Sequence, residues 1–527
     1  MQTAPHRLVG QLEEQWARLE TNFHRAYWRS QVDANPETEK KRSETELELR
    51  RAKGDPDAFR AVSEALDEDL QEPVLRRQLE LQLRSLTANQ MSDDQRTRLV
   101  ELSSSVESDF ASHRPEVDGR PATENEIEAI LKESDDEALR RRAWEASKEI
   151  GSLVADRIRE LARVRNETAR ALGFADYYRM SLDLQEIDEA WLFGLLAELE
   201  ELTEKPFFSW KASLDARLKE RFRTDLVLPW HLSDPFFQQL PADGGVSLDQ
   251  ALREGDALDL TRRTFARWGI DLSGVFAKSD LFPRANKCQH AFCLDVDRSG
   301  EDVRILANVV PGERWIEVML HESGHAAYDC GINRGLPYLL HRPAHTFVTE
   351  GIAILCGRLV HDPGWLASIA GVDERGLGGL GEAVRRASAA RALLFARWGL
   401  VMVNFERDLY ADPEGDLDHR WWELVHRFQG VEGPAGRTAP DWATKIHVAV
   451  APVYYHNYLL GEMFASQLRA ALEDAGEGTM DGPEVGRFLE ERVFRHGALL
   501  RGDLLVESAT GRRLAATDLA SDLESAI

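Results

Sequence analysis

The chain has 527 residues, of which 43% are hydrophobic, so it can bury a large core. Its formal net charge of −26 argues against nucleic acid and anionic membranes as partners, because binding to either requires a basic face. No apolar stretch reaches the roughly 18 residues of a membrane span, and the N-terminus shows no secretory signal. The 4 cysteines form no C-x-x-C pair. We therefore expect a cytoplasmic protein with neither nucleic-acid nor membrane partners.

Helix-forming patterns occupy most of the chain. Charged amphipathic segments come first, and a long segment with apolar residues at helical spacing follows them. The helices predicted in the N-terminal half span residues 7–32, 36–54, 56–69, 137–172 and 189–219. The apolar stripe predicted for the fourth of these consists of Trp144, Ile150, Leu153, Val154, Ile158, Leu161 and Val164. The same pattern returns at residues 383–410, 416–429 and 442–473, so the sequence predicts a mainly α-helical protein.

One segment alternates in the manner of β-strands. Residues 289–297 and 302–310 are two such runs, and a polar turn at residues 298–301 separates them. The pattern predicts one short antiparallel hairpin directly before the helix that carries the next motif. The edge strand of this hairpin could pair with an extended peptide backbone.

The strongest chemical signal is the run His321-Glu322-Ser323-Gly324-His325, which has the form H-E-x-x-H. Two histidines four positions apart lie on one face of an α-helix, where a single cation can bind both imidazoles. Apolar residues at 315–320 lead into the run, which predicts a largely buried helix. Glu322 lies one step around that helix, within reach of a water on the metal rather than of the metal itself.

A second apolar run, residues 347–360, carries Glu350 near its start. A carboxylate among so many apolar neighbours would be costly to bury unpaired, so a metal or a strong hydrogen-bond partner is expected. Two histidines and a carboxylate, with one coordination position left open, form a ligand set of catalytic zinc sites. The sequence therefore predicts one Zn²⁺ per chain, bound by His321, His325 and Glu350.

A cluster of polar residues follows in the C-terminal part of the chain. Amide hydrolysis at zinc passes through an oxyanion, which N–H and O–H donors beside the metal stabilise. His447 and one of Tyr455 or Tyr458 have the required side chains, and Lys445 is a point charge suited to a terminal carboxylate. Alternatively these tyrosines, with Tyr454, are interior aromatics of the predicted helix.

The metal motif and the carboxylate after it resemble those of the angiotensin-converting-enzyme family of zinc dipeptidyl carboxypeptidases. The related thimet oligopeptidase and oligoendopeptidase F family shares the same metal pattern. Four further segments carry the resemblance: Gln289-His290-Ala291, the Leu-Pro segment in residues 335–342, the His-Leu stretch in residues 231–239, and Lys445-Ile446-His447 with the tyrosines that follow. Together they span roughly residues 230–470, whereas the amino-terminal third is similar to the family's lid only in being helical.

The resemblance implies a fold as well as a chemistry. We expect a single helical metallopeptidase domain over residues 1–527, of the two-lobed zincin type with a deep central cleft. Residues 1–130 would form lid-like helices, and residues 230–470 would form the core that binds metal and substrate.

The resemblance also implies roles for individual side chains. His290 and Ala291 would hydrogen-bond the substrate backbone. Lys445 would hold the substrate's C-terminal carboxylate together with Gln239, for which Gln238 is the competing candidate. The tyrosines lie one residue further from His447 than in the family, which leaves the choice among Tyr454, Tyr455 and Tyr458 open. Tyr455 and Tyr458 keep the family's three-residue interval, which favours Tyr458 with His447 for the oxyanion and Tyr455 for substrate binding.

Two positions depart from the family pattern. Asn457 stands where the family has a chloride-binding arginine, which argues against activation by chloride. Ile354 stands where a carboxylate would accept a hydrogen bond from a metal-binding histidine. Another group must take that second role, because a ligating imidazole usually donates its other N–H to a partner.

The sequence therefore predicts a zinc metallopeptidase that hydrolyses oligopeptides, with Glu322 as the base that activates a water at the metal. A peptidyl-dipeptidase, which releases C-terminal dipeptides, is the first hypothesis. An oligoendopeptidase that cuts internal bonds is the alternative within the same chemistry. A non-catalytic peptide-binding protein on the same fold is the alternative from another class.

Overall fold

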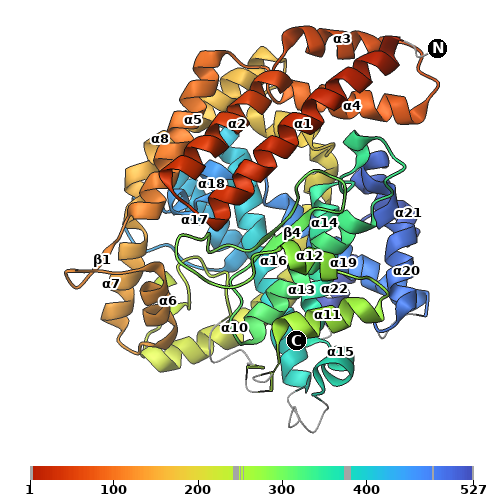
Figure 1. Ribbon diagram of the computed structural model, residues 1–527. Helices are drawn as coiled ribbons and strands as arrows, with labels where there is room; N and C mark the ends of the chain where they lie inside the picture. Colours follow the sequence, from red (N-terminus) through yellow and green to blue (C-terminus); the bar gives the residue numbers. More distant parts are fainter. Residues whose placement is uncertain are drawn as a thin grey trace. The chain divides into compact units, whose positions relative to one another are not determined.

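The computed structural model describes residues 4–240, 248–249, 251–252, 255–372, 381–476 and 480–524 (Figure 1). The chain divides into two compact units, each built from separate stretches of sequence. Unit 1 comprises Met1–Gln90, Ser247–Gly381 and Leu460–Ala515, and unit 2 comprises Met91–Val246, Glu382–Leu459 and Ala516–Ile527. The mainly α-helical class predicted from the sequence is confirmed. Among the described residues, no helix combines the length and the apolar character that a membrane span needs.

Unit 1 contains the hairpin and the metal motif. Its helices are α1 (Ala4–Val32), α2 (Pro36–Lys53), α3 (Pro56–Asp67), α4 (Pro73–Thr87), α11 (Ala257–Arg267), α12 (Ser273–Lys278), α13 (Glu313–Gly331), α14 (Thr346–Arg358), α15 (Pro363–Trp365), α20 (Pro483–Arg492) and α21 (Gly502–Thr510). The first three helices agree closely with the predicted ranges. Of the residues 1–130 predicted as lid-like helices, the first 90 fall in unit 1 and the remainder in unit 2.

Unit 2 contains the remaining long helices. They are α5 (Asp93–Ser112), α6 (Glu124–Glu133), α7 (Glu137–Ser147), α8 (Glu149–Ala171), α9 (Tyr177–Leu184), α10 (Glu189–Phe222), α16 (Gly381–Ala411), α17 (Leu417–Gln429), α18 (His447–Val450) and α22 (Thr517–Glu524). A further helix, α19 (His456–Asp474), starts in unit 2 and continues in unit 1. Two strands, β1 (Glu116–Val117) and β2 (Arg120–Pro121), form an antiparallel pair that the sequence did not predict.

The helix predicted over residues 137–172 is two helices joined at Lys148. The backbone of Lys148 leaves the regular geometry of α7 at φ −95°, ψ −7°, and its side chain is buried. A Cβ atom on Gly151, in the first turn of α8, would lie 2.4 Å from the carbonyl oxygen of Pro440. The first turn of α8 therefore packs closely against the segment that contains Pro440, directly after the break at Lys148. The predicted apolar stripe is buried except for Leu153, which is 56% exposed.

The predicted helix over residues 442–473 is also interrupted. A 3-10 turn at Asp441–Thr444 and the short helix α18 precede α19. Pro452 has no backbone N–H to continue the hydrogen-bond ladder of α18. The next residue, Val453, adopts a left-handed conformation with φ 54°. The chain therefore does not continue as one helix from α18 into α19.

The predicted hairpin is confirmed in unit 1. Strand β3 (Phe292–Asp295) pairs antiparallel with β4 (Val303–Leu306), in a register that places Phe292 opposite Leu306. Phe292 packs against Trp28 of α1, with 6.0 Å between their ring centroids, so the first helix of the chain supports this hairpin. Strand β3 is shorter than the predicted run of residues 289–297. His290 and Ala291 lie immediately before the strand rather than in it.

Candidate metal centre and substrate-binding residues

The H-E-x-x-H motif lies on α13, which packs side by side with α14, the helix that carries Glu350 (Figure 1). Glycine at position 324, inside the motif, permits this close packing. A Cβ atom there would lie 2.9 Å from Cα of Ala353 and 3.1 Å from Sγ of Cys356. The small residue thus lets the two helices approach until a side chain of α14 reaches the histidines of α13.

His321, His325 and Glu350 offer ligand atoms that all lie within 4.8 Å of one another. Oε2 of Glu350 lies 3.8 Å from Nε2 of His321 and 4.0 Å from Nε2 of His325. Two ligands that bind one ion at about 2.0–2.1 Å can be at most about 4.2 Å apart, so both pairs are compatible with one zinc ion. Glu322 is not part of this group. The geometry therefore fits the predicted ligand set and leaves Glu322 for another role.

Burial sets the protonation states that this site needs. It lowers the pKa of His321 to about 4 and that of His325 well below its usual value, so both imidazoles are neutral and can bind a cation. Burial, together with the nearby charge of Glu350, raises the pKa of Glu322 to about 8. A carboxyl group with such a pKa can both take up and release a proton near neutral pH.

The hairpin lies directly beside this site. Glu322 accepts a hydrogen bond from the backbone N–H of Cys293 in β3, which opposes the rise of its pKa. His290 is exposed and Ala291 is partly buried, just before β3 begins. Asn308, after β4, donates to the carbonyl oxygens of Cys288 and Gln289 at 3.0 and 3.3 Å. These bonds fix the approach to β3 next to the metal helix.

Thr349 supplies the hydrogen bond for which Ile354 has no suitable atom. Its Oγ1 lies 2.7 Å from Nδ1 of His325. With Nε2 of His325 directed toward Glu350, the Nδ1–H group can donate to this hydroxyl and fix the ring's orientation. The sequence analysis missed Thr349, although its place directly before Glu350 on α14 was a usable signal.

Thr349→Val is expected to weaken zinc binding by about 10–100-fold, the usual effect of losing such an outer partner. Competition with a chromogenic chelator measures the affinity, and Thr349→Ser should retain most of it. Ser323→Ala is the matched control, because Oγ of Ser323 is buried in the motif without a hydrogen-bond partner among the described residues. Wild-type affinity in Thr349→Val would contradict the role of Thr349.

The predicted oxyanion residues His447 and Tyr458 belong to unit 2, where they lie together with Tyr455. The ring centroids of His447 and Tyr455 lie 5.3 Å apart, and those of Tyr455 and Tyr458 lie 5.6 Å apart. Tyr455 is buried, and its hydroxyl accepts a hydrogen bond from Nε1 of Trp398 at 3.3 Å. Burial raises the pKa of Tyr455 to about 12, so this phenol remains protonated.

Lys445 contacts Gln238 rather than Gln239. Its Nζ donates to Oε1 of Gln238 at 3.0 Å, whereas Gln239 donates its backbone N–H to Asp234 at 2.9 Å. Burial lowers the pKa of Lys445 to about 8, and the charge of Asp234 opposes this shift. A carboxylate that joined Lys445 and Gln238 would favour the charged ammonium.

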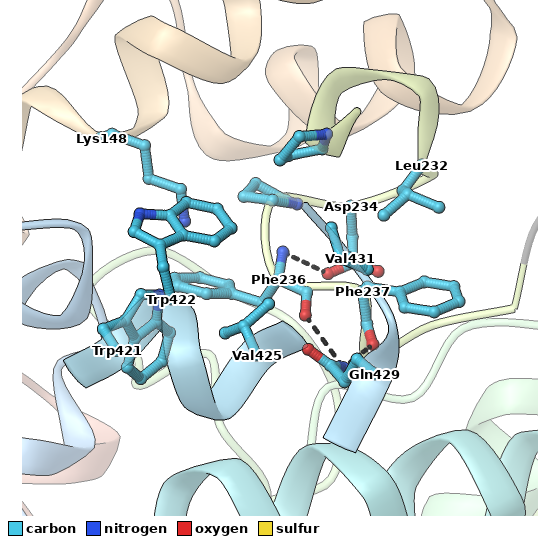
Figure 2. Close-up of a pocket in the computed structure, with 12 residues that line it drawn as sticks. Lys148, Leu232, Asp234, Phe236, Phe237, Trp421, Trp422, Val425, Gln429 and Val431 are labelled. Carbon is cyan, nitrogen blue, oxygen red and sulfur yellow. Dashed lines mark hydrogen bonds between the residues drawn. The ribbon is translucent and has the colours of Figure 1, made fainter. Parts of the chain in front are cut away.

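The loop that carries Gln238 is held by buried polar groups beside a pocket of unit 2. Figure 2 shows Asp234 accepting the backbone N–H of Phe236, and the amide of Gln429 donating to the carbonyl groups of Phe236 and Phe237. Nζ of Lys148 lies 3.6 Å from the centroid of the Phe236 ring. The conformation of this loop, rather than sequence spacing, selects Gln238.

Comparison with known proteins adds a family. Residues 2–223 match the model of the family described as angiotensin-converting enzyme. A search of curated proteins found no match. The matched residues include α1 to α10, so the view that this part is similar to the family only in its helicity is corrected. The matched residues end before the metal motif, so the metal site is supported by its own geometry and not by the match.

Two independent parts of the chain thus agree. The N-terminal helices carry the family match, and residues outside the match bring two histidines and a carboxylate to within 4.8 Å of one another. Residues 2–223 are therefore similar to the angiotensin-converting-enzyme family, and the metal ligand set predicted from the sequence lies outside the matched part.

Proposed function

We propose that the protein is a peptidyl-dipeptidase, a zinc metallopeptidase that releases dipeptides from the free C-termini of oligopeptides. The contact between Lys445 and Gln238 is the observation that carries this choice of cut position. An ammonium and an amide that already share a hydrogen bond form a site for one carboxylate. A site of this kind would bind the free C-terminus of the substrate.

His321, His325 and Glu350 are the residues that would hold the metal. Bound zinc supplies Lewis-acid chemistry, which polarises the scissile carbonyl and acidifies water. Glu322 accepts a proton from the attacking water and transfers it to the amine nitrogen as the C–N bond breaks.

Tyr458 and His447 complete the proposed mechanism as donors to the oxyanion. The ring of Tyr458 lies next to those of Tyr455 and Tyr454, with centroid separations of 5.6 and 5.2 Å. The residues directly before β3, exposed His290 and partly buried Ala291, are proposed to bind the substrate main chain.

C-terminal amidation of a test peptide is expected to lower kcat/KM by about 10–100-fold, the range for losing a hydrogen bond to a charged group. Lys445→Met should make the acid and amide forms equally good substrates, because it removes the ammonium and keeps the alkyl chain. Gln238→Ala should reduce the difference between the two forms. Mass spectrometry of the products reports both the rate and the bond that is cut.

Gln239→Ala is the matched control for Gln238→Ala, and it should leave the acid-to-amide ratio at the wild-type value. Equal cleavage of acid and amide peptides at internal bonds by the wild type would instead identify an oligoendopeptidase. Absence of any cleavage, with zinc bound, would favour a peptide-binding protein on the same fold.

A further inference from the structure

The turn between α18 and α19 has an unusual backbone. Val453 adopts φ 54°, a left-handed conformation that β-branched residues rarely accept. The side chain of Val453 is also buried. This turn joins the helix that begins at His447 to the segment that carries Tyr455 and Tyr458. A strained conformation persists only where its surroundings hold it, and such sites cluster where function requires a fixed geometry.

Two side chains hold the peptide groups of Val453. Its N–H donates to Oε1 of Glu406 at 2.5 Å, and its carbonyl oxygen accepts from Nε2 of Gln185 at 3.1 Å. Glu406 comes from α16 and is only 3% exposed, while Gln185 caps the end of α9. A buried carboxylate is costly unless it is bound by donors or an opposite charge.

Arg165 of α8 provides the opposite charge near Glu406. It is itself buried, and it donates to the carbonyl oxygen of Ala449 at 2.7 Å and to the hydroxyl of Tyr410 at 2.9 Å. Glu406 and Arg165, both buried, therefore bind the main chain on both sides of Pro452. Glu406 holds the residue after the proline, and Arg165 holds α18 before it.

The same network extends into the first turn of α19. Nδ2 of Asn457 donates to Oε1 of Gln185 at 3.1 Å and to the carbonyl oxygen of Tyr454 at 3.1 Å. Asn457 is fully buried. Glu406, Gln185 and Asn457 thus link the strained turn to the backbone on which Tyr455 and Tyr458 are carried.

We propose that Glu406 and Gln185 are positioning residues, which hold the Val453 turn so that Tyr458 presents its hydroxyl for transition-state stabilisation. The inference rests on the function proposed above for Tyr458. A network that served only to stabilise the fold would have no need of a β-branched residue in a left-handed turn. Asparagine or glycine would occupy that conformation at lower cost.

Glu406→Met tests the inference, because it removes the acceptor for the Val453 N–H and keeps a side chain of similar length. We expect kcat to fall by about 10–100-fold with KM unchanged, since the tyrosine would act on the transition state rather than on substrate binding. Zinc content and the acid-to-amide ratio should stay at wild-type values. Glu406→Gln retains an oxygen acceptor and should restore most of kcat.

Asn404→Met is the matched control on the same helix. The Asn404 amide is buried and donates to the carbonyl oxygen of Leu400 at 2.9 Å, within α16 itself. This variant should keep wild-type kcat. If Glu406→Met does not yield folded protein, Gln185→Met carries the same expected loss of kcat, because it removes the bond to the Val453 carbonyl.

A double-mutant cycle separates this inference from the proposed function. In a Tyr458→Phe background, Glu406→Met should cause little further loss, because the group that it positions is already gone. An undiminished kcat in folded Glu406→Met, or an equal loss in both backgrounds, would overturn the positioning role. A fully active Tyr458→Phe would contradict the function of Tyr458 and the inference with it.

Discussion

Replacement of Glu322 by glutamine should lower kcat by about 10²–10⁴, the range that general acid–base catalysis contributes. Glutamine preserves the size of the side chain and its ability to accept the backbone N–H of Cys293. It cannot take up the proton of the attacking water. Because Glu322 lies outside the group of three ligand atoms, the variant should bind zinc normally.

Zinc analysis and single-turnover kinetics on the same preparation check this expectation. A normal zinc content with slow turnover supports Glu322 as the base. Loss of zinc with retention of activity would instead make Glu322 a ligand and would contradict the assignment.

His321→Ala should abolish both metal binding and peptide hydrolysis. It leaves one histidine and one carboxylate, too few for a catalytic zinc site. Atomic absorption on dialysed protein measures the metal, and a quenched-fluorescence peptide measures the activity. His496→Ala is the control, because that imidazole bonds to the carbonyl oxygen of Glu491 outside the ligand group. Full activity in His321→Ala would exclude this residue as a required ligand.

The metal site was largely predictable from the sequence, because its signal is local. Helical periodicity alone places His321 and His325 on one face, and the apolar run before Glu350 identifies a second buried helix. The contribution of Gly324 was not predictable in this way. Its role depends on the distance between α13 and α14, which is a property of tertiary packing.

Gln238 and Gln239 lie in a loop, where the sequence has neither helical nor strand periodicity. Asp234 accepts backbone N–H groups from Phe236, Gln238 and Gln239, and this arrangement turns Gln238 toward Lys445. Sequence spacing treats neighbouring glutamines as equivalent, so it could not distinguish them. Thr349 was not predicted, because sequence spacing does not show which side chain of α14 reaches Nδ1 of His325.

The helices were predicted where one periodic pattern continues without interruption. The breaks at Lys148 and Val453 were missed because buried side chains and close backbone contacts override local helix propensity there. Leu153 was assigned to the buried stripe by spacing, yet it faces solvent with 56% exposure. The strands β1 and β2, of two residues each, are too short to produce an alternating pattern.

The central claim, a zinc-dependent peptidase that cuts from the C-terminus, is tested most directly by one digest. A mixture of unstructured peptides is incubated with the holoenzyme, with chelated protein, and with chelated protein after zinc is restored, and the products are identified by mass spectrometry. The account predicts C-terminal dipeptides from the first and third samples and intact peptides from the second. Full turnover by the metal-free protein, verified by metal analysis, would contradict it.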